Sequence, residues 1–492
     1  MNLKTLLESV SVVDYFGPDQ KGVVVSGVSS DSRRIKSGYV FVAVRGVFSD
    51  GHTYISDALL QHAAAIVVSD PKSVRHGHTP FIVVEDSREA LVCLCDHCYD
   101  HPYRKMNFIG ITGTNGKTTV SYLISGILRA AGINSGLIGT IAHRVKEGLS
   151  YGSMNTTPGV AELHEISREM IDAGDKYAVM EVSSHALDQE RVQGITFNAA
   201  IFTNLTQDHL DYHKTMEEYY RAKQKLFMCY AAPSTTFIVN KDDSCGSRLL
   251  ESLQGRKFSY GFSSQADFWP ESCQLERHFT KAIIQTPAGK IEIETSLVGR
   301  HNLYNILAAL AWGVTEGLDL TIIKNGIEGV KFVPGRLERV NNTRGFSIFV
   351  DYAHTEDALK NVLESLRATL HNGRIITVFG CGGDRDKTKR PKMGRLAVSL
   401  SDHVIITSDN PRNEDAGMIA SEVVGGLDMG RVEIELDRFE AIKRALLFAR
   451  PHDIVLIAGK GHEEYQIIKG RTIPFNDKKA IIDILQESGH YV

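Results

Sequence analysis

The sequence lacks the features that mark membrane and secreted proteins. None of its 492 residues lies in an apolar run as long as a bilayer-spanning helix. The first residues, MNLKTLLESVSVVDYF, carry acids at Glu8 and Asp14 and no long apolar core, which argues against a signal peptide. The formal net charge is only −4, so neither nucleic acid nor an anionic membrane is indicated as a partner. We therefore expect a cytoplasmic protein.

Disulfide bonds are not expected either. The chain has 7 cysteines, an odd number without a signal peptide, which favours free thiols. The stretch CLCDHCYDH could suggest zinc, but we expect it to lie on one helix from Ser87 to Asp100, opened by a serine cap. Cys93 and Cys95 then point in different directions, and no second ligand pair follows at zinc-finger spacing. We interpret the cysteines as core thiols; the alternative metal cluster would consist of Cys93, Cys95, His97, Cys98 and His101.

The sequence also has no short internal repeat and no low-complexity segment. Its length suggests two to four domains, and its 42% hydrophobic and 23% charged residues are ordinary for a globular protein. Strand-like and helical segments alternate, which predicts α/β domains with parallel sheets covered on both faces. Before the last third of the chain, the predicted strands are KGVVVSGVSSDSRR, YVFVAV, AAAIVVSD, TPFIVVED, NFIGITGT, YAVMEVSSHAL, NAAIFTNLTQDHLDYH and STTFIVNKDD, and YISDALLQHAA and KTTVSYLISGILRAAG are predicted helices.

The α/β pattern restarts after VPGRLERV, residues Val333–Val340. The segments FSIFVDYAH, RIITVFGCGG, DHVIITSDNPR, RVEIEL and DIVLIAGKG are strand-like and separated by helical stretches. Charged motifs end these strands: DYAH, GCGGDRDK, SDNPR and GKGHEEY. Because ligands of such sheets bind beyond the carboxyl ends of the strands, we expect a second ligand site here.

The stretch GITGTNGKTTV, Gly110–Val120, is typical of a phosphate-binding loop, although Ile111 stands where the general pattern has glycine. Gly113 and Gly116 let backbone N–H groups face phosphate oxygens. Lys117 can neutralise phosphates, and Thr118 can give an oxygen to magnesium. The strand, loop and helix context favours nucleotide binding over the alternative, a glycine-rich turn with a surface lysine.

Two further residues could serve a phosphate or metal site. Glu181 ends the apolar run of MEVSSH, where a carboxylate would ligate magnesium; the alternative is a solvated acid at a strand end. His209 in QDHLDYH is a candidate metal or phosphate contact. His213 follows four residues later, but Leu210 replaces the glutamate of the zinc pattern H-E-x-x-H, so we interpret His213 as structural.

Further motifs follow one another along nearly the whole chain: GTNGKTT, NTTP, EVSSH, TNLTQDHLDYH, RAKQKLF, GRHNLYN, PGRLE, DYAHTEDAL, GCGGDRDKTKRP, DNPR and GKGHEEYQ. In this order they resemble the Mur ligases of peptidoglycan synthesis, and within that family the MurE type. The family's phosphate loop has the shorter form G-T-N-G-K-[ST], so Ile111 is no defect. The family often has proline after DYAHT; this chain has Glu356, a loop change that we expect to be minor.

The resemblance implies three α/β domains. These are a UDP-binding domain at residues 1–88, a central ATP-binding domain at 89–334 and a Rossmann-like amino-acid-binding domain at 335–492. It also implies ATP and Mg²⁺: the γ-phosphoryl group moves to a substrate carboxylate, and an amine then displaces phosphate from the acyl phosphate. The implied partners are a UDP-N-acetylmuramoyl dipeptide and an amino acid, with no nucleic acid or membrane, and we expect a monomer.

The resemblance further implies roles for individual residues. Thr118 and Glu181 match the first magnesium site, and Lys223 of YYRAKQKLF matches a lysine that family members carry as a carbamate, which can support a second magnesium. The alternative for Lys223 is a basic residue on a solvated helix face. The residues implied as catalytic are Lys117, Glu181, His209 and Lys223. The implied nucleotide-binding residues of the phosphate loop and the start of its helix are Gly113, Thr114, Asn115, Gly116, Lys117, Thr118 and Thr119. Asn302 and Asn305 are implied on the adenine side, Arg336 at the γ-phosphate and Asp351 at the ribose.

The implied contacts to the UDP-muramyl peptide lie in the first half of the chain. The turn SSDSR offers hydrogen-bonding groups suited to a diphosphate and uracil, although alone it would be interpreted as a polar turn. The implied residues are Ser30 and Ser32, with Asp31 and Arg33 beside them, and Asn155, Thr156, Thr157, Ser183, Gln189 and Arg191.

The motif DNPR indicates which amino acid is added. Arg412 would repel the terminal ammonium of lysine but can hold the extra carboxylate of meso-diaminopimelate bidentately, and in the family this motif marks the diaminopimelate adders. Arg385 resembles a contact to another carboxylate of that amino acid, and Gly459 and Glu463 resemble contacts to its amino group. The implied pocket consists of Arg385, Asp409, Asn410, Pro411, Arg412, Gly459 and Glu463.

Three other functions remain as alternatives. A folylpolyglutamate synthetase shares the central and C-terminal plan but has no UDP-binding front domain. A P-loop switch or motor would hydrolyse ATP without needing a charged amino-acid pocket. A binding module without catalysis would keep full function after Lys117→Ala.

Overall fold

The computed structural model describes residues 1–46, 49–145, 149–152 and 155–491, and only the backbone of 149–152. The chain divides into two compact units. The first unit contains residues 1–110, 133–200 and 225–235, and the second contains 111–132, 201–224 and 236–492.

The chain begins with a five-stranded sheet in the order β1-β5-β4-β3-β2. All neighbours are parallel except β1, which pairs antiparallel with β5. Alternate residues of these strands pack on α1 and α3 on one side and on α2 on the other. The elements are α1 Leu3–Leu7, β1 Val12–Phe16, β2 Gly27–Ser29, β3 Tyr39–Val42, α2 Ile55–Leu60, β4 Ala65–Val68, β5 Phe81–Val84 and α3 Ser87–Cys98, with 3₁₀ turns at Gln20–Gly22, Ser32–Arg34, Gly51–Tyr54, Pro71–Ser73 and Pro102–Arg104.

Two expectations for this region need correction. The first predicted strand is much shorter, because the Asp31 side chain accepts the N–H of Arg33 and turns the chain into a 3₁₀ helix after β2. The predicted helix around the cysteines exists, but its cap is Asp86, whose carboxylate accepts the N–H groups of Arg88 and Glu89. Ser87 is the first helical residue.

An eight-stranded sheet follows, in the order β13-β12-β11-β6-β10-β7-β8-β9. Its strands are β6 Asn107–Thr112, β7 Ser135–Ile138, β8 Ala142–Val145, β9 Leu149–Gly152, β10 Tyr177–Glu181, β11 Phe197–Phe202, β12 Ala231–Asn240 and β13 Lys257–Tyr260. The accompanying helices are α4 Lys117–Ala130, α5 Val160–Asp172, α6 Ser184–Asp188, α7 Leu210–His213, α8 Met216–Met228, α9 Ser244–Ser252, α10 Arg300–Thr315 and α11 Leu320–Gly329. The predicted strand, loop and helix around Gly113–Gly116 is confirmed as β6 and α4.

Sequence reasoning did not identify a small antiparallel sheet in the second unit. Its order is β14-β15-β16, with β14 Trp269–Leu275, β15 Thr280–Thr286 and β16 Gly289–Thr295. Antiparallel β8 and β9 were also not predicted.

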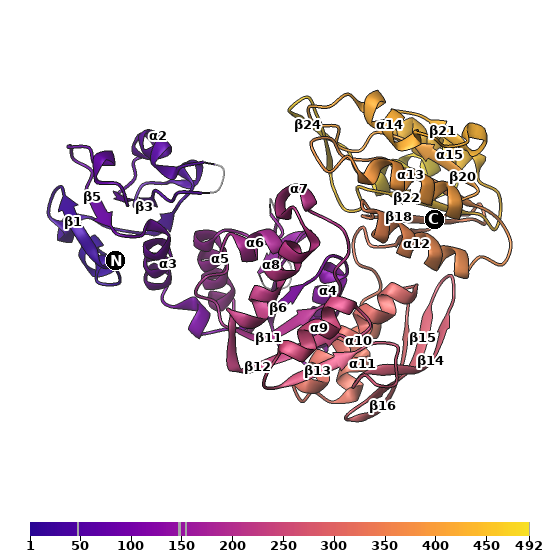
Figure 1. Ribbon diagram of the computed structural model, residues 1–492, viewed down its shortest axis with the longest axis horizontal. Helices are drawn as coiled ribbons and strands as arrows, with labels where there is room; N and C mark the ends of the chain where they lie inside the picture. Colours follow the sequence, from indigo (N-terminus) through magenta and orange to yellow (C-terminus); the bar gives the residue numbers. More distant parts are fainter. Residues whose placement is uncertain (47–48, 146–148, 153–154, 492) are drawn as a thin grey trace. The chain divides into compact units, whose positions relative to one another are not determined.

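The last part of the chain is a three-layer sandwich around the sheet β17-β18-β22-β19-β20-β21, drawn in orange and yellow in Figure 1. Helices α12, α13 and α14 pack on one face and α15 and α16 on the other. The elements are β17 Glu338–Val340, β18 Ser347–Asp351, α12 Glu356–Ala368, β19 Ile375–Phe379, α13 Lys389–Leu400, β20 His403–Ile406, α14 Ala416–Val424, a 3₁₀ turn Met429–Arg431, β21 Val432–Ile434, α15 Arg438–Phe448, β22 Ile454–Ala458, β23 Tyr465–Ile468, β24 Arg471–Pro474 and α16 Asp477–Glu487. The predicted strands of this domain are confirmed, and the β23–β24 hairpin is an addition.

No helix in the described part of the chain is long and apolar enough to span a bilayer.

Candidate active site

The loop between β6 and α4 has the geometry of a phosphate cradle. Gly113 and Gly116 have φ angles of +148° and +89°, and a Cβ would lie 1.8 Å from Thr203 Oγ1 at Gly113 and 2.3 Å from Asn305 Oδ1 at Gly116. Only glycine fits there, and Gly116 opens α4 without a side-chain cap, which leaves the helix N-terminus suited to an anion. Ile111, which stands where the general pattern has glycine, is fully buried near the end of β6.

Two lysines converge on one carbonyl of this loop. Lys117 Nζ donates to Gly113 O at 2.9 Å and to Thr114 O at 2.8 Å, and Lys223 Nζ donates to Gly113 O at 2.7 Å. Lys223 is only 1% exposed, so the alternative of a solvated surface lysine is wrong. Burial, and then the charge of Lys117, lower the pKa of Lys223 well below its usual value.

A third cation reaches the same helix start. Arg336 Nη2 donates to Thr118 Oγ1 at 3.0 Å, and its guanidinium lies 4.7 Å from the centre of the Tyr352 ring. Asp351 holds the Arg336 loop, because its two oxygens accept the N–H groups of Leu337 at 2.6 Å and Ala353 at 2.7 Å. Burial raises the pKa of Asp351. Three basic side chains around a glycine-built cradle, with Lys117 and Arg336 as its cations, fit a triphosphate.

The two asparagines predicted for the adenine side are buried on α10 under the loop. Asn302 Nδ2 donates to Val298 O at 2.8 Å, and Asn305 Nδ2 donates to Asn302 Oδ1 at 3.1 Å. The Asn305 carbonyl lies against Gly116. In the described structure the pair therefore supports the cradle from below.

Asp208, His209 and His213 follow β11 in the second unit. His209 has a left-handed φ of 53°, and its Nε2 lies 3.3 Å from Asp208 Oδ2. Burial raises the pKa of Asp208, but His209 and other nearby cationic groups outweigh it, so the net shift is downward. His213 is buried and stacks on Tyr219 with ring centres 5.2 Å apart, consistent with a structural role.

Sequence reasoning did not identify Asp357, which lies in the first turn of α12. Its Oδ2 accepts from Asn115 Nδ2 at 2.9 Å in the phosphate loop, and also from Thr206 Oγ1 at 3.2 Å. Its neighbour Glu356 is the first residue of α12 after the Thr355 cap, a position that suits both proline and an acid, which explains why the departure from the family pattern leaves the loop intact. Both acids line a cavity of about 180 Å³ together with Asp208, Asp386 and Lys389.

In the first unit, most of the residues predicted for the muramyl peptide gather around Glu181. This carboxylate is fully buried at the end of β10 and accepts from Thr140 N and Thr140 Oγ1, both at 3.0 Å, so the alternative of a solvated acid is wrong. Thr157 Oγ1 donates to Glu181 O at 2.9 Å and accepts from Ser183 N at 3.0 Å.

A second contact set extends this cluster. Arg191 Nη1 donates to Thr157 O at 3.1 Å, and its Nε and Nη2 donate to Gln189 Oε1 at 3.0 and 2.7 Å. Thr156 Oγ1 lies 3.0 Å from Thr140 Oγ1, and Asn155 is exposed beside them. Hydrogen bonds therefore link the predicted residues Thr156, Thr157, Ser183, Gln189 and Arg191 to Glu181 in one cluster.

The SSDSR turn lies at the end of β2. Ser30 is exposed, Ser32 is buried, and Arg33 forms a bidentate contact with Asp31 through Nε at 2.9 Å and Nη2 at 2.7 Å. A side-chain hydrogen bond from Arg33 lowers the pKa of Asp31. The turn thus offers hydroxyl groups and backbone N–H groups more readily than a free cation.

In the C-terminal sandwich, the loop after β20 carries Arg412 and the loop after β19 carries Arg385, and the two arginines lie close together. Arg412 has a left-handed φ of 51°, and its Nη1 donates to Gly383 O at 2.8 Å. Burial, and then the charge of Arg385, lower the pKa of Arg412, so the two guanidiniums repel each other. Such a pair favours a bound carboxylate.

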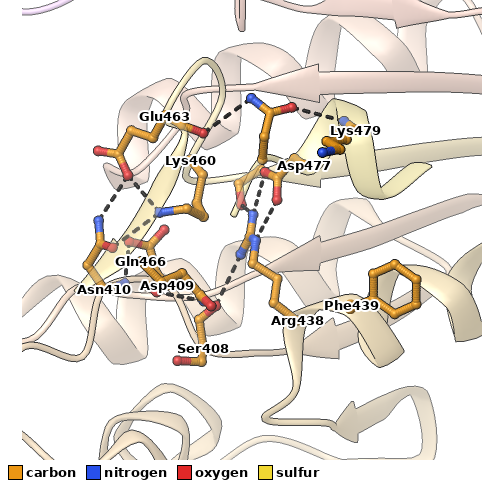
Figure 2. A network of polar contacts seen from close by, with 12 residues as sticks. Ser408, Asp409, Asn410, Arg438, Phe439, Lys460, Glu463, Gln466, Asp477 and Lys479 are labelled. Carbon is orange, nitrogen blue, oxygen red and sulfur yellow. Dashed lines mark hydrogen bonds and ion pairs between the residues drawn. The ribbon is translucent and has the colours of Figure 1, made fainter. Parts of the chain in front are cut away.

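Acids and a lysine lie in a network of polar contacts on the loops after β20 and β22, as Figure 2 shows. Lys460, which has no exposed surface, donates to Glu463 Oε2 at 2.7 Å and to Asn410 Oδ1 at 3.2 Å. Asp409 Oδ2 is buried without a hydrogen-bond partner, and a Cβ on Gly459 would lie 2.7 Å from it. The loops after β19, β20 and β22 thus present positive and negative groups side by side.

Each unit, taken by itself, offers one hard oxygen ligand of the kind that Mg²⁺ prefers. The second unit has the Thr118 hydroxyl, and the first unit has the buried Glu181 carboxylate. Among the residues that the structure describes, no group of three or more His, Cys, Asp and Glu side chains is arranged to hold a metal ion. All seven cysteines are unpaired thiols; on α3, Cys95 is buried and Cys93 and Cys98 are half-buried.

Three family models match the chain. They are "Mur ligase family, catalytic domain" at residues 24–99, "Mur ligase middle domain" at 111–313 and "Mur ligase, glutamate ligase domain" at 335–461.

Curated relatives extend the match to nearly the full length. The chain is 44% identical over 485 residues to the UDP-N-acetylmuramoyl-L-alanyl-D-glutamate–2,6-diaminopimelate ligase of Geobacter metallireducens, covering 94% of each chain. It is 43% identical over 491 residues to the ligase of the same name from Parabacteroides distasonis, covering 98% of this chain and 99% of that one.

Solved structures agree on the fold. A structure of a ligase with this name superposes with a TM-score of 0.68 at 29% identity, covering 100% of both chains. A folylpolyglutamate synthase from Mycobacterium tuberculosis shares only the fold, with a TM-score of 0.63 at 19% identity over 75% of this chain. The phosphate cradle, the domain matches and the identity along nearly the whole chain together show that this protein belongs to the Mur ligase family of ATP-dependent ligases.

Proposed function

We propose that this ligase joins meso-diaminopimelate to the D-glutamate carboxylate of UDP-N-acetylmuramoyl-L-alanyl-D-glutamate in peptidoglycan synthesis. The observation that carries the amino-acid assignment is the mixed-charge pocket of the C-terminal sandwich. Arg412 and Arg385 suit a carboxylate, and the unpartnered Asp409 Oδ2 suits an ammonium group. A zwitterionic end group satisfies both, whereas the lone ammonium of lysine leaves the arginines without a counter-charge.

The phosphate cradle supplies the activation step. Lys117 and Arg336 balance the charge of the triphosphate while its γ-phosphoryl group moves to the glutamate carboxylate, giving an acyl phosphate. The amine of diaminopimelate then attacks the acyl carbon, and phosphate leaves with the C–O bond pair while the amine loses a proton. Thr118 and Glu181 are the residues that would hold Mg²⁺, which would supply charge neutralisation when bound. His209 is a further phosphate or metal contact.

Lys223 takes a different part in the proposal. Its buried neutral amine reacts with carbon dioxide to give a carbamate and a proton, which turns an uncharged group into an anion beside Lys117. That anion would support a second Mg²⁺. The lowered pKa of Lys223 supports this step, because only the neutral amine reacts.

The remaining assignments follow the chain. We place UDP at residues 1–88, with Ser30 and Ser32 as contacts, and the dipeptide at the Thr157 and Glu181 cluster. ATP occupies residues 89–334, with Asn302 and Asn305 on the adenine side and Asp351 of the next domain at the ribose, and diaminopimelate occupies 335–492. A cytoplasmic monomer is expected.

An amino-acid panel tests the function. Phosphate release would be measured with ATP, the UDP-dipeptide and either meso-diaminopimelate, L-lysine or L-ornithine. We expect turnover with meso-diaminopimelate and at least about a hundredfold lower kcat/KM for the other two, since an unpaired buried charge costs several kcal/mol. Equal use of lysine would contradict the pocket assignment, and phosphate release that ignores both the peptide and the amino acid would favour a P-loop switch.

Asp357 gives a second test, directed at ATP. Asp357→Ala removes the acceptor shared by Asn115 and Thr206, so we expect the KM for ATP to rise about tenfold, the effect of losing a hydrogen bond to a charged group. Glu364→Ala is the matched control, because Glu364 is an exposed acid on the same helix. The measurement is the initial rate as a function of ATP concentration. Equal KM values for ATP in the two variants would show that Asp357 does not contribute to nucleotide binding.

A further inference from the structure

A buried ion pair lies behind the amino-acid pocket. Neither the Arg438 nor the Asp477 side chain has exposed surface. Arg438 Nε donates to Asp477 Oδ1 at 2.7 Å, and Nη2 donates to Asp477 Oδ2 at 2.8 Å (Figure 2). Arg438 is the first residue of α15 and Asp477 the first residue of α16, the two helices that cover one face of the C-terminal sheet. No residue of the pair is among the predicted substrate contacts.

The remaining donors of Arg438 reach the two pocket loops. Nη2 also donates to Ala458 O at 3.0 Å, and Nη1 donates to Ser408 O at 3.3 Å. Ala458 ends β22 and precedes Gly459, and Ser408 precedes Asp409. Each carbonyl therefore lies one peptide bond before a predicted substrate contact.

A second layer of contacts locks the same loops together. Lys460 of one loop donates to Asn410 Oδ1 of the other, and Asn410 Nδ2 donates to Glu463 Oε2 at 2.9 Å. Gln466 Nε2 donates to Asp409 O at 2.9 Å, and Ile467 N donates to Asn410 Oδ1 at 3.0 Å. Because Gly459 packs directly against the Asp409 carboxylate, a displacement of a few tenths of an ångström between the loops would change the pocket.

A buried ion pair is not needed for stability alone. Removing two charges from water is costly, and an apolar pair of similar volume often stabilises a fold equally well. The fork of Arg438, however, can hold a carboxylate and two carbonyls in a fixed geometry, which an apolar pair cannot. We infer that Arg438 and Asp477 are positioning residues that set the spacing between the Asp409–Arg412 loop and the Gly459–Glu463 loop. The inference rests on the proposed function, which assigns these loops to diaminopimelate.

A matched pair of conservative variants tests the inference. Arg438→Lys keeps the charge but loses the fork. Arg374→Lys makes the same change at an ion pair with Asp453, where the N–O distance is 2.7 Å. Asp453 precedes β22 and Ala458 ends it, so the two variants affect opposite ends of one strand.

Steady-state constants for all three substrates are measured with both variants. For Arg438→Lys we expect the KM for diaminopimelate to rise about tenfold, with a similar loss of preference over lysine, because small misplacements of contact groups have effects of this order. The KM values for ATP and the UDP-dipeptide should stay within about twofold. Arg374→Lys should lower the thermal midpoint without changing any KM.

The double variant Arg438→Met with Asp477→Leu covers the case in which Arg438→Lys does not fold. It removes both charges together, so a folded protein with weakened diaminopimelate binding supports the inference. Unchanged diaminopimelate binding, parallel changes in all three KM values, or failure of both variants to fold would each overturn it, because the pair would then serve only the fold. Absence of diaminopimelate use by the unaltered protein would instead overturn the proposed function.

Discussion

Lys223→Ala is expected to lower kcat about a thousandfold, while the protein folds and still binds ATP. The lysine is buried and shares the Gly113 carbonyl with Lys117, so its replacement removes a charged group placed directly at the phosphate cradle. Loss of one preorganised electrostatic group typically costs a hundredfold to a thousandfold in turnover. The measurement is phosphate release at saturating substrates, with nucleotide binding followed separately.

Chemical rescue distinguishes the carbamate from a simple lysine. A short carboxylic acid such as formate should restore part of the activity of Lys223→Ala, and removal of bicarbonate should lower the activity of the unaltered protein. This bicarbonate dependence should weaken as the pH rises and strengthen as it falls, because protonation of the amine below its lowered pKa opposes carbamate formation. Lys225→Ala is the control, since that lysine is partly exposed and pairs with Asp188. Full activity of Lys223→Ala would sink the proposal for this residue.

Arg412→Ala is expected to raise the KM for meso-diaminopimelate about a hundredfold and leave the KM for ATP within about twofold. Removing one partner of a partly buried charge pair costs 2–5 kcal/mol, much of it from the charge left behind. The backbone around Arg412 should persist, because its N–H donates to Ile467 O at 2.9 Å and its carbonyl accepts from Lys469 N at 2.7 Å. The KM of Arg412→Lys for meso-diaminopimelate should lie between those of the unaltered protein and Arg412→Ala, since lysine keeps the charge but cannot form the bidentate contact.

The matched control for Arg412 is Arg395→Ala, an exposed arginine on α13 of the same sandwich. Its KM values for meso-diaminopimelate and ATP should equal those of the unaltered protein. If Arg412→Ala weakens ATP and diaminopimelate equally, the arginine serves the general stability of the domain and not amino-acid recognition.

The sequence was sufficient for the regular parts of the fold because the signals there are local. Apolar runs such as IVLIA in β22 are buried on both faces, and the loop GTNGKT carries its glycines at the two positions with positive φ. Local patterns did not reveal β14–β16, because alternating polar and apolar residues at 269–295 are weakly distinctive and form strands through pairing with each other. The predicted strand runs too far, into the SSDSR turn. The chain leaves β2 there because the Asp31 carboxylate accepts the backbone N–H of Arg33.

Residues whose roles depend on distant partners were the least predictable. Asp357 contacts Asn115 across 242 positions of sequence, and nothing in DYAHTEDAL indicates that partner. Arg438 and Asp477 have ordinary helix-start neighbours, and only the folded sheet places them behind the pocket. Lys223 could be identified only from the family resemblance, because its burial follows from how α8 packs and not from its neighbours Arg221 and Lys225.

The close packing of Gly459 against Asp409 has a consequence for inhibitor resistance. With φ at +112° and a Cβ position only 2.7 Å from Asp409 Oδ2, Gly459 tolerates no side chain without strain or collision. Asp409 in turn cannot lengthen to glutamate without pressing on the same backbone. A compound that binds both groups would therefore meet a surface that point mutations cannot easily reshape.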